Sequence, residues 1–217
     1  MRPAQRLFIL LAIATLLASC GSPPAKPVPP SAPPTATRQN FANTAQCLSA
    51  LFSTGASFRK IEDFRHGNGC GIDRAVSLAA TAPNTPVNPA ADIGCDMAVA
   101  FSRLANEVIQ PEALRLLGQP VARINQVAGY SCRNRAPGKL SEHAKGRAID
   151  ISGFVMADGS LVDVEDDWRG SGAKSEFLRT IGRRACDYVS IVLGPSHDRA
   201  HRNHFHFDLG RWELCDP

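Results

Sequence analysis

Apolar and polar side chains alternate strictly near the end of the chain, over residues 203–209. Phe205, Phe207 and Leu209 occupy one set of positions, and the other set is His204, His206 and Asp208. Successive side chains of a strand point to opposite faces, so this pattern predicts a strand that buries one set and presents two imidazoles on its other face. Similar alternation or short apolar runs predict strands over 121–130, 147–155, 161–164 and 191–193, the third pairing back on the second as a hairpin.

Helical periodicity dominates the segment 94–109, where apolar positions recur near every 3.6 residues and predict an amphipathic helix. Pro111 is expected to kink it or to start a second helix, which Gly118 closes. Two further helices are predicted, one over 44–52 and one over 171–188.

Residues 81–91 contain three prolines and two asparagines, so we expect a surface loop there. Helices before and between antiparallel-type strands predict an α+β domain, with a small antiparallel sheet flanked by helices. At 217 residues the chain is long enough for one such domain, assigned to residues 43–217.

The start of the chain has a different composition. Residues 1–19 place arginines before a short apolar run, which is typical of an export signal and too short for a membrane span. The end of that run, Leu17-Ala18-Ser19-Cys20, resembles the lipobox of bacterial lipoproteins, which implies cleavage before Cys20 and a lipid on its sulfur. An ordinary signal peptide with a chance cysteine is the alternative. Residues 20–42 are rich in Pro, Ala and Ser and are expected to form an extended linker.

Charge excludes one class of partner. The 24 basic residues, less Arg2 and Arg6 in the signal, are nearly balanced by 20 acidic ones, and no basic patch argues for nucleic acid.

Six of the seven cysteines follow Cys20, and in an exported chain they predict three disulfides. Sequence alone does not fix the pairing, but we expect neighbours to pair. The expected bonds are Cys47 with Cys70, Cys95 with Cys132, and Cys186 with Cys215. A zinc cluster of cysteines is disfavoured because no C-x-x-C pair occurs.

The histidines gather in two segments, which together predict a single metal site with ligands from both. The first offers His143 and, seven residues on, Asp150, and the second offers His206 beside His204. Two imidazoles and one carboxylate leave one position of a tetrahedral zinc open for water, which is the ligand count of a hydrolytic site. We therefore predict Zn²⁺ bound by His143, Asp150 and His206.

Each of these residues also has an ordinary interpretation, because single histidines are more often solvated or hydrogen-bonded in a core. The combination argues against it. A carboxylate at Asp150 between Ile149 and Ile151 would be costly to bury without a partner.

The motif Ser141-x-His143-x-x-Gly146-x-Ala148-x-Asp150 with His204-x-His206 resembles the zinc motif of the LAS metallopeptidases, which include lysostaphin-type, D-alanyl-D-alanine and hedgehog-like members. The segment from about 47 to 216 more specifically resembles the bacterial extensin-like C-terminal family, through residues 129–133, 166–168, 177–179, 193–195 and 201–206. These resemblances imply a hedgehog/DD-peptidase-like sheet, zinc held as proposed, and hydrolysis of peptide bonds in peptidoglycan stems or cross-links.

One departure leaves the general base open. The carboxypeptidase branch has a glutamate where this chain has Asn203, so we rank His204 first as base, His201 second and a distant carboxylate third. Arg133 matches an arginine that relatives direct at the substrate, although its plain interpretation is a solvated loop cation. Trp168 and Trp212 either line the groove or fill the core.

The leading hypothesis is therefore a monomeric zinc metallopeptidase, lipid-anchored at the periplasmic face of a Gram-negative outer membrane and acting on peptidoglycan. The rival is a catalytically inactive, zinc-stabilised lipoprotein that binds or assembles the wall. A third is a zinc hydrolase of another exported peptide.

Overall fold

The computed structural model describes residues 41–217. The predicted signal peptide, the lipid at Cys20 and nearly all of the linker lie outside the described residues. No helix within 41–217 is long and apolar enough to cross a membrane.

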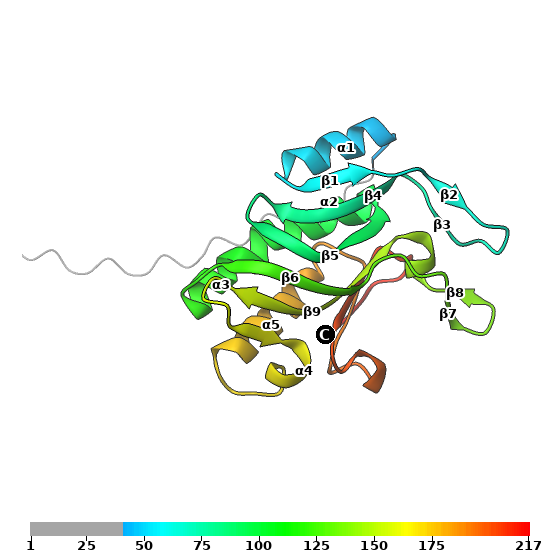
Figure 1. Ribbon diagram of the computed structural model, residues 1–217. Helices are drawn as coiled ribbons and strands as arrows, with labels where there is room; N and C mark the ends of the chain where they lie inside the picture. Colours follow the sequence, from blue (N-terminus) through cyan, green and yellow to red (C-terminus); the bar gives the residue numbers. More distant parts are fainter. Residues whose placement is uncertain (1–40) are drawn as a thin grey trace, which may run out of the picture. The chain divides into compact units, whose positions relative to one another are not determined.

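A nine-stranded sheet forms the centre of this part of the chain (Figure 1). Its order is β1 (Ser57–Lys60), β4 (Ala75–Ala82), β5 (Thr85–Gly94), β6 (Val121–Ala128), β9 (Ala148–Met156), β12 (Phe205–Asp208), β11 (Ile191–Leu193) and β13 (Leu214–Asp216), and β10 (Leu161–Asp163) pairs with β9. Only the β5–β6 and β11–β13 pairs of this sheet are parallel. The α+β prediction is confirmed, and β6, β9, β10, β11 and β12 are the five strands that alternation indicated.

Helices cover one face of the sheet and lie behind the strands in Figure 1. They are α2 (Cys95–Leu104), α3 (Gln110–Leu117) and α5 (Ala173–Ala185), with α1 (Thr44–Ser53) at the β1 end and the short α4 (Val164–Asp167) after β10. The turn η1 (Ala105–Ile109) between α2 and α3 is π-helical. This wider turn fits Pro111, which lacks an N–H and cannot continue regular α-helical bonding. Gly118, at φ 71°, then closes α3 as predicted.

The core lies between these helices and the sheet, and β12 contributes two of its largest side chains. Phe205 and Phe207 are fully buried and stack with ring centroids 5.7 Å apart. Trp168 packs edge-on against Phe205 and is buried, so it fills the core. Because strand side chains alternate, His206 between the two phenylalanines points away from the helices.

The surface loop predicted for 81–91 is wrong, because β4 and β5 form a hairpin there. The prolines fit because pairing is irregular where they fall: the register shifts on both sides of the Ala80–Pro86 pair. Val87, Ala91 and Ile93 are buried at alternating positions, a strand pattern that the prolines obscured.

Two of the three expected disulfides are wrong. The bonds are Cys47–Cys95, Cys70–Cys132 and Cys186–Cys215, so only the last matches. Cys47 lies in α1 and Cys95 begins α2, and packing of these helices brings the two together across 48 residues. Cys70 lies in the small hairpin of β2 (Phe64–Arg65) and β3 (Gly71–Ile72), which is tied to the loop before β7 (Asn134–Ala136).

Candidate metal centre

Three different elements carry the predicted ligands. His143 lies on the short 3-10 helix η2 (Glu142–Lys145), Asp150 on β9 and His206 on β12. The pairing register of the two strands sets His206 directly opposite Asp150. Ser141 caps η2, accepting a hydrogen bond from the backbone N–H of His143, so the sequence motif shapes the turn as well as supplying ligands.

Gly146 closes η2 in the left-handed region at φ 63°. A Cβ there would lie 2.8 Å from Ile72 Cγ2 and 3.0 Å from the backbone nitrogen of Gly94. The glycine of the motif therefore allows η2 to pack tightly against β3 and the end of β5, which fixes His143 relative to β9.

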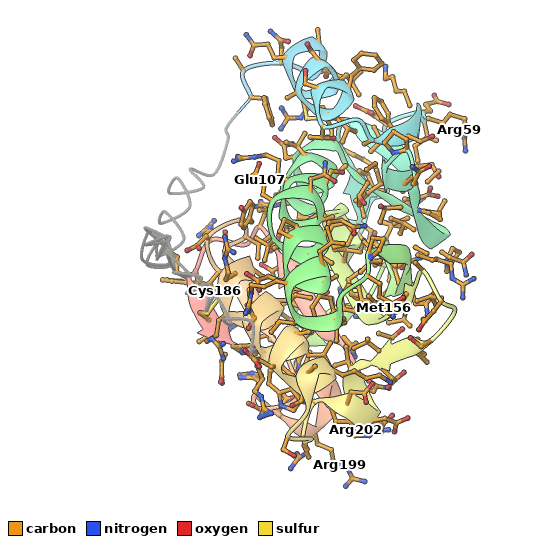
Figure 2. The ribbon with its side chains drawn as sticks, turned by 90° about the vertical axis from the view of Figure 1, so that its left-hand side faces the viewer. Arg59, Glu107, Met156, Cys186, Arg199 and Arg202 are labelled. Atoms are coloured by element: carbon orange, nitrogen blue, oxygen red, sulfur yellow. A yellow bond between two sulfur atoms is a disulfide. The ribbon has the colours of Figure 1, made fainter. Side chains whose placement is uncertain are left out.

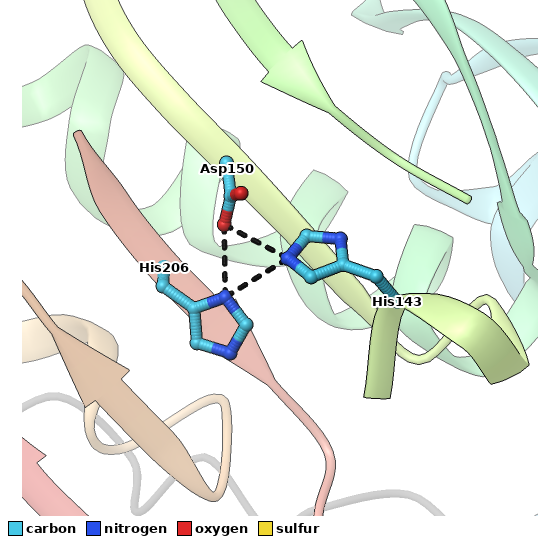
Figure 3. A group of neighbouring side chains, drawn as sticks. All are labelled: His143, Asp150 and His206. Atoms are coloured by element: carbon cyan, nitrogen blue, oxygen red, sulfur yellow. Dashed lines mark hydrogen bonds and ion pairs between the residues drawn. The ribbon is translucent and has the colours of Figure 1, made fainter. Parts of the chain in front are cut away.

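The three side chains converge on one point (Figure 3). His143 Nε2 lies 3.1 Å from Asp150 Oδ1 and 3.0 Å from His206 Nδ1, and His206 Nδ1 lies 2.8 Å from Asp150 Oδ1. All three residues are buried. The sequence prediction that these groups lie together is confirmed, while the identity of any ion stays a prediction.

Hydrogen bonds behind the two imidazoles determine which ring nitrogens are free. His143 Nδ1 lies 2.7 Å from the carbonyl oxygen of Gly129, which can only accept, so Nδ1 carries the hydrogen. His206 Nε2 likewise donates to Asp208 Oδ2 at 2.8 Å. In their neutral forms both rings therefore direct lone pairs at the carboxylate of Asp150. Three lone pairs so close together repel one another unless a proton or a metal ion lies among them.

This donor set fits zinc. Imidazole nitrogens and a carboxylate oxygen bind Zn²⁺ at about 2.0–2.2 Å, which places tetrahedral ligand atoms roughly 3.4 Å apart. The observed separations of 2.8–3.1 Å need to widen by only a few tenths of an ångström. Bonds from ligand imidazoles to a carbonyl and a carboxylate are the usual outer support of a zinc site.

The electrostatics of the protein alone also favour positive charge at this point. Burial opposes protonation of His206, but its hydrogen bonds to Asp150 and Asp208 outweigh burial and raise its pKa to about 9. Burial also penalises ionised Asp150, yet hydrogen bonds to His143 and His206 lower the pKa of that carboxyl well below its usual range. Asp150 is therefore an anion that calls for a cationic partner.

The proposed proton-handling histidines lie beside the centre. His204 Nε2 is 3.8 Å from Asp150 Oδ2, and its Nδ1 donates to Asn203 Oδ1 at 2.9 Å. Burial lowers the pKa of His204, although the charge of Asp150 opposes that shift. The ring centroid of His201 lies 5.3 Å from that of His204 and 5.8 Å from that of His206.

Arg133 also faces the centre. Its Nη2 lies 3.6 Å from Asp150 Oδ2, and about half of its side chain is exposed. The predicted substrate-facing cation is therefore adjacent to the predicted ligands, and it follows Cys132 of the disulfide that anchors its loop.

Sequence reasoning missed the supporting residues. Asp208 was placed on the histidine face of its strand without a role, and its i+2 spacing from His206 was the available signal. Gly129 acts through its carbonyl and gave no signal. A second group, His197, Asp198 and His201, has side-chain nitrogens and oxygens within 4.8 Å of one another, but Asp198 also caps the backbone of η3 (Arg199–His201). That bonding gives Asp198 a structural role in the turn.

A cleft of about 770 Å³ opens beside the centre, and His201, His206 and Asp208 are among its lining residues. Trp212 lines it too and is 72% exposed, whereas Trp168 is in the core. The volume is in the range of small-ligand sites. The three converging groups are therefore next to a space large enough for a small ligand.

No curated protein and no solved structure was found to match this chain. A family model does match it, the one described as extensin-like protein C-terminus, over residues 45–216. The match spans the described domain from α1 to β13, including every residue of the metal centre. The chain therefore belongs to the extensin-like protein C-terminus family.

Proposed function

We propose that this protein is a zinc-dependent peptidase of the cell envelope that hydrolyses peptide bonds in peptidoglycan. The observation that carries the proposal is the convergence of three lone pairs, from His143, Asp150 and His206, beside an open cleft. Bound zinc would supply an activated water and a Lewis acid for the scissile carbonyl. Three protein ligands leave a coordination position for that water, as in hydrolytic rather than structural zinc sites.

His204 is the residue we assign to proton transfer. Because its Nδ1 donates to Asn203, the lone pair of the neutral ring is on Nε2, the nitrogen nearer Asp150. His204 would accept a proton from the attacking water and, once charged, favour the anionic tetrahedral intermediate. His201, hydrogen-bonded to Asp198 at 2.8 Å, is the second choice.

Arg133 is assigned to the substrate carbonyl or carboxylate. Its guanidinium is the charged group that reaches Asp150 from the loop side, and half of it stays exposed for a ligand. Paired only loosely with Asp150, at 3.6 Å, it can turn to a substrate at little cost.

Location in the envelope rests on the sequence. The export signal, Cys20 and the proline-rich linker would attach the domain to a membrane facing the wall, with room to search the polymer. Gly21 and Ser22, rather than an aspartate, follow Cys20, which resembles the pattern of lipoproteins sorted to the outer membrane and favours its periplasmic face. The similarity of the two histidine motifs to those of the LAS metallopeptidases supports the same substrate.

The second candidate is a zinc-stabilised lipoprotein that binds or assembles the wall without turnover. It is favoured by Asn203 standing where one branch of those peptidases has a glutamate base. The carboxylates that line the cleft do not replace that base, because Glu142, Asp198 and Asp208 are each already bound to cations or imidazoles.

The test is to measure zinc in the purified protein and to digest isolated cross-linked muropeptides, separating products by mass. We expect one zinc per chain and new peptide termini, both lost on chelation. Bound zinc with no cleaved product would leave the wall-binding candidate, and absence of zinc binding would reject both.

His204→Ala separates the two candidates further. A peptidase should keep its zinc and lose most of its turnover, about 10²-fold or more if the ring transfers a proton. His66→Ala, at an exposed loop histidine outside the centre, is the matched control and should change neither.

A further inference from the structure

Basic side chains dominate the lining of the cleft beside the metal centre. Its cations are Arg133, Arg135, Lys139, Lys145, Arg147 and Arg211, against the carboxylates Glu142, Asp198 and Asp208. The whole chain, by comparison, is nearly balanced, with 24 basic and 20 acidic residues. Positive charge is therefore concentrated here.

Internal pairing already occupies the carboxylates of the cleft. Glu142 lies 3.5 Å from Lys145 and 3.4 Å from Arg147, so it is shared by two cations. Asp208 binds His206 and the backbone N–H of Gly210, and Asp198 binds His201 and the backbone of η3. None of the three is directed at the remaining arginines and lysine.

Three cations of the cleft have no acidic partner among residues 41–217. Arg135, Lys139 and Arg211 are exposed, and no carboxylate of residues 41–217 lies within 4.0 Å of their charged groups. Unpaired charges of one sign along a concave surface raise the local concentration of an oppositely charged ligand. The cleft is therefore suited to an anion.

The hairpin of β7 (Asn134–Ala136) and β8 (Lys139–Leu140) positions two of these charges. It projects from the sheet in Figure 1 and carries Arg135 and Lys139. The Cys70–Cys132 disulfide fixes the chain just before it, where Arg133 reaches to 3.6 Å from Asp150. The cations therefore continue from Arg133 at the metal centre onto the projecting hairpin.

We propose that this cleft selects peptides that carry free carboxylates, holding them through Arg135, Lys139 and Arg211 while the bond to be cut lies at the metal centre. The inference rests on the proposed function for identifying the ligand as a wall peptide. A peptide is favoured over a polymeric phosphate because the cleft, at about 770 Å³, holds a few residues and ends at groups suited to amide hydrolysis. Trp212 and Leu214 add an apolar wall for side chains.

The experiment compares binding of two synthetic stem peptides to the zinc-loaded protein, one with free side-chain carboxylates and one with the same groups amidated. Fluorescence anisotropy at low salt would measure both. We expect the free acid to bind at least about tenfold more tightly, and added salt to remove most of the difference.

Variants then test the residues. The double variant Arg135→Gln/Lys139→Gln and the single variant Arg211→Gln should each weaken binding of the free acid by about threefold to tenfold and leave the amidated peptide unchanged. The matched control is Arg59→Gln/Lys60→Gln in β1, a pair of exposed cations outside the cleft, and should change nothing. Figure 2 shows Arg59 at the opposite end of the domain from Arg199 and Arg202.

Several outcomes would overturn the inference. They are equal binding of the two peptides, no binding of the free acid, equal loss in the β1 control, or a short polyphosphate that binds as tightly as the free acid. Because the readout is binding, the proposed function can fail separately. Selective binding without cleavage would reject the peptidase activity and keep the carboxylate selectivity. Cleavage without preference for free carboxylates would keep the peptidase activity and reject the selectivity.

Discussion

Asp208 is not one of the predicted zinc ligands, yet replacing it with alanine should weaken zinc binding strongly. The carboxylate accepts from His206 Nε2 at 2.8 Å and from the backbone N–H of Gly210 at 2.7 Å. The first bond holds the ring in the tautomer whose Nδ1 faces Asp150 and His143. Without it, the buried ring is free to move its hydrogen to Nδ1, where zinc needs a lone pair.

The size of the effect follows from burial. The side chain of His206 is 11% exposed, so water cannot fully replace the lost acceptor. Loss of an outer partner of this kind typically costs 10–100-fold in metal affinity, which corresponds to about 1.4–2.7 kcal/mol. Asp208→Asn keeps an oxygen acceptor but loses its charge, and its effect should lie near the lower end of that range.

Competition with a chromophoric zinc chelator measures the affinity, and thermal unfolding of the metal-free protein checks the fold. The chain offers a matched control in Asp216→Ala, which removes a carboxylate bound to His197 Nδ1 at the same 2.8 Å but away from the centre. The control should keep wild-type affinity. A folded Asp208→Ala protein that binds zinc as tightly as the wild type would refute the assignment of His206 Nδ1 as a ligand.

Three further experiments test how the rest of the domain is stabilised. Gly146→Ala places an alanine in the left-handed region and against Ile72 of β3, and it should lower the free energy of unfolding by about 2–4 kcal/mol. Gly159→Ala is the control, because Gly159 has φ 85° but open space around it, and it should cost only about 1–2 kcal/mol. Chemical denaturation measures both. Cys70→Ser/Cys132→Ser opens a link across 62 residues and should cost about 2–4 kcal/mol, seen as a lower melting temperature. Backbone N–H groups at the start of β4 lower the pKa of Asp63. Ionised Asp63 therefore stabilises the folded state above the unfolded pKa of about 4, and this contribution is lost as pH falls through the folded pKa. Asp63→Asn should make the free energy of unfolding less sensitive to acid, as measured by unfolding at a series of pH values.

Local pattern was enough to predict the two strands that carry Asp150 and His206, but not the short helix η2 that carries His143. Alternation of apolar and polar residues over 203–209 predicts the buried face of a strand, and the 3.6-residue period over 94–109 predicts the buried face of a helix. Both elements form as expected, as β12 and α2. The β4–β5 hairpin was missed because Pro86 and Pro89 are strand breakers by local rules. Their places in the sheet depend on register shifts, which only the paired strands define.

Connectivity between distant segments was the least predictable part. The cysteine pairing depends on how α1 packs on α2 and on where the β2–β3 hairpin lies, and neither is encoded in spacing along the chain. The three metal-centre residues were predictable for a different reason. Their residue types and spacing are those of metal ligands, and Asp150, between Ile149 and Ile151, needs a partner if it is buried.

The same alternation that builds the core also fixes the metal centre, because it determines which face of β12 carries His206. Slipping β12 by one residue would turn Phe205 and Phe207 out to solvent and carry His206 into the core. Burial of each phenylalanine stabilises by about 1.5–3 kcal/mol, so roughly 3–6 kcal/mol opposes the slip. That margin can hold His206 opposite Asp150 before any ion arrives. On this reasoning the hydrophobic face of the strand preorganises the centre, and a bound zinc ion would stabilise an arrangement that the core has already imposed.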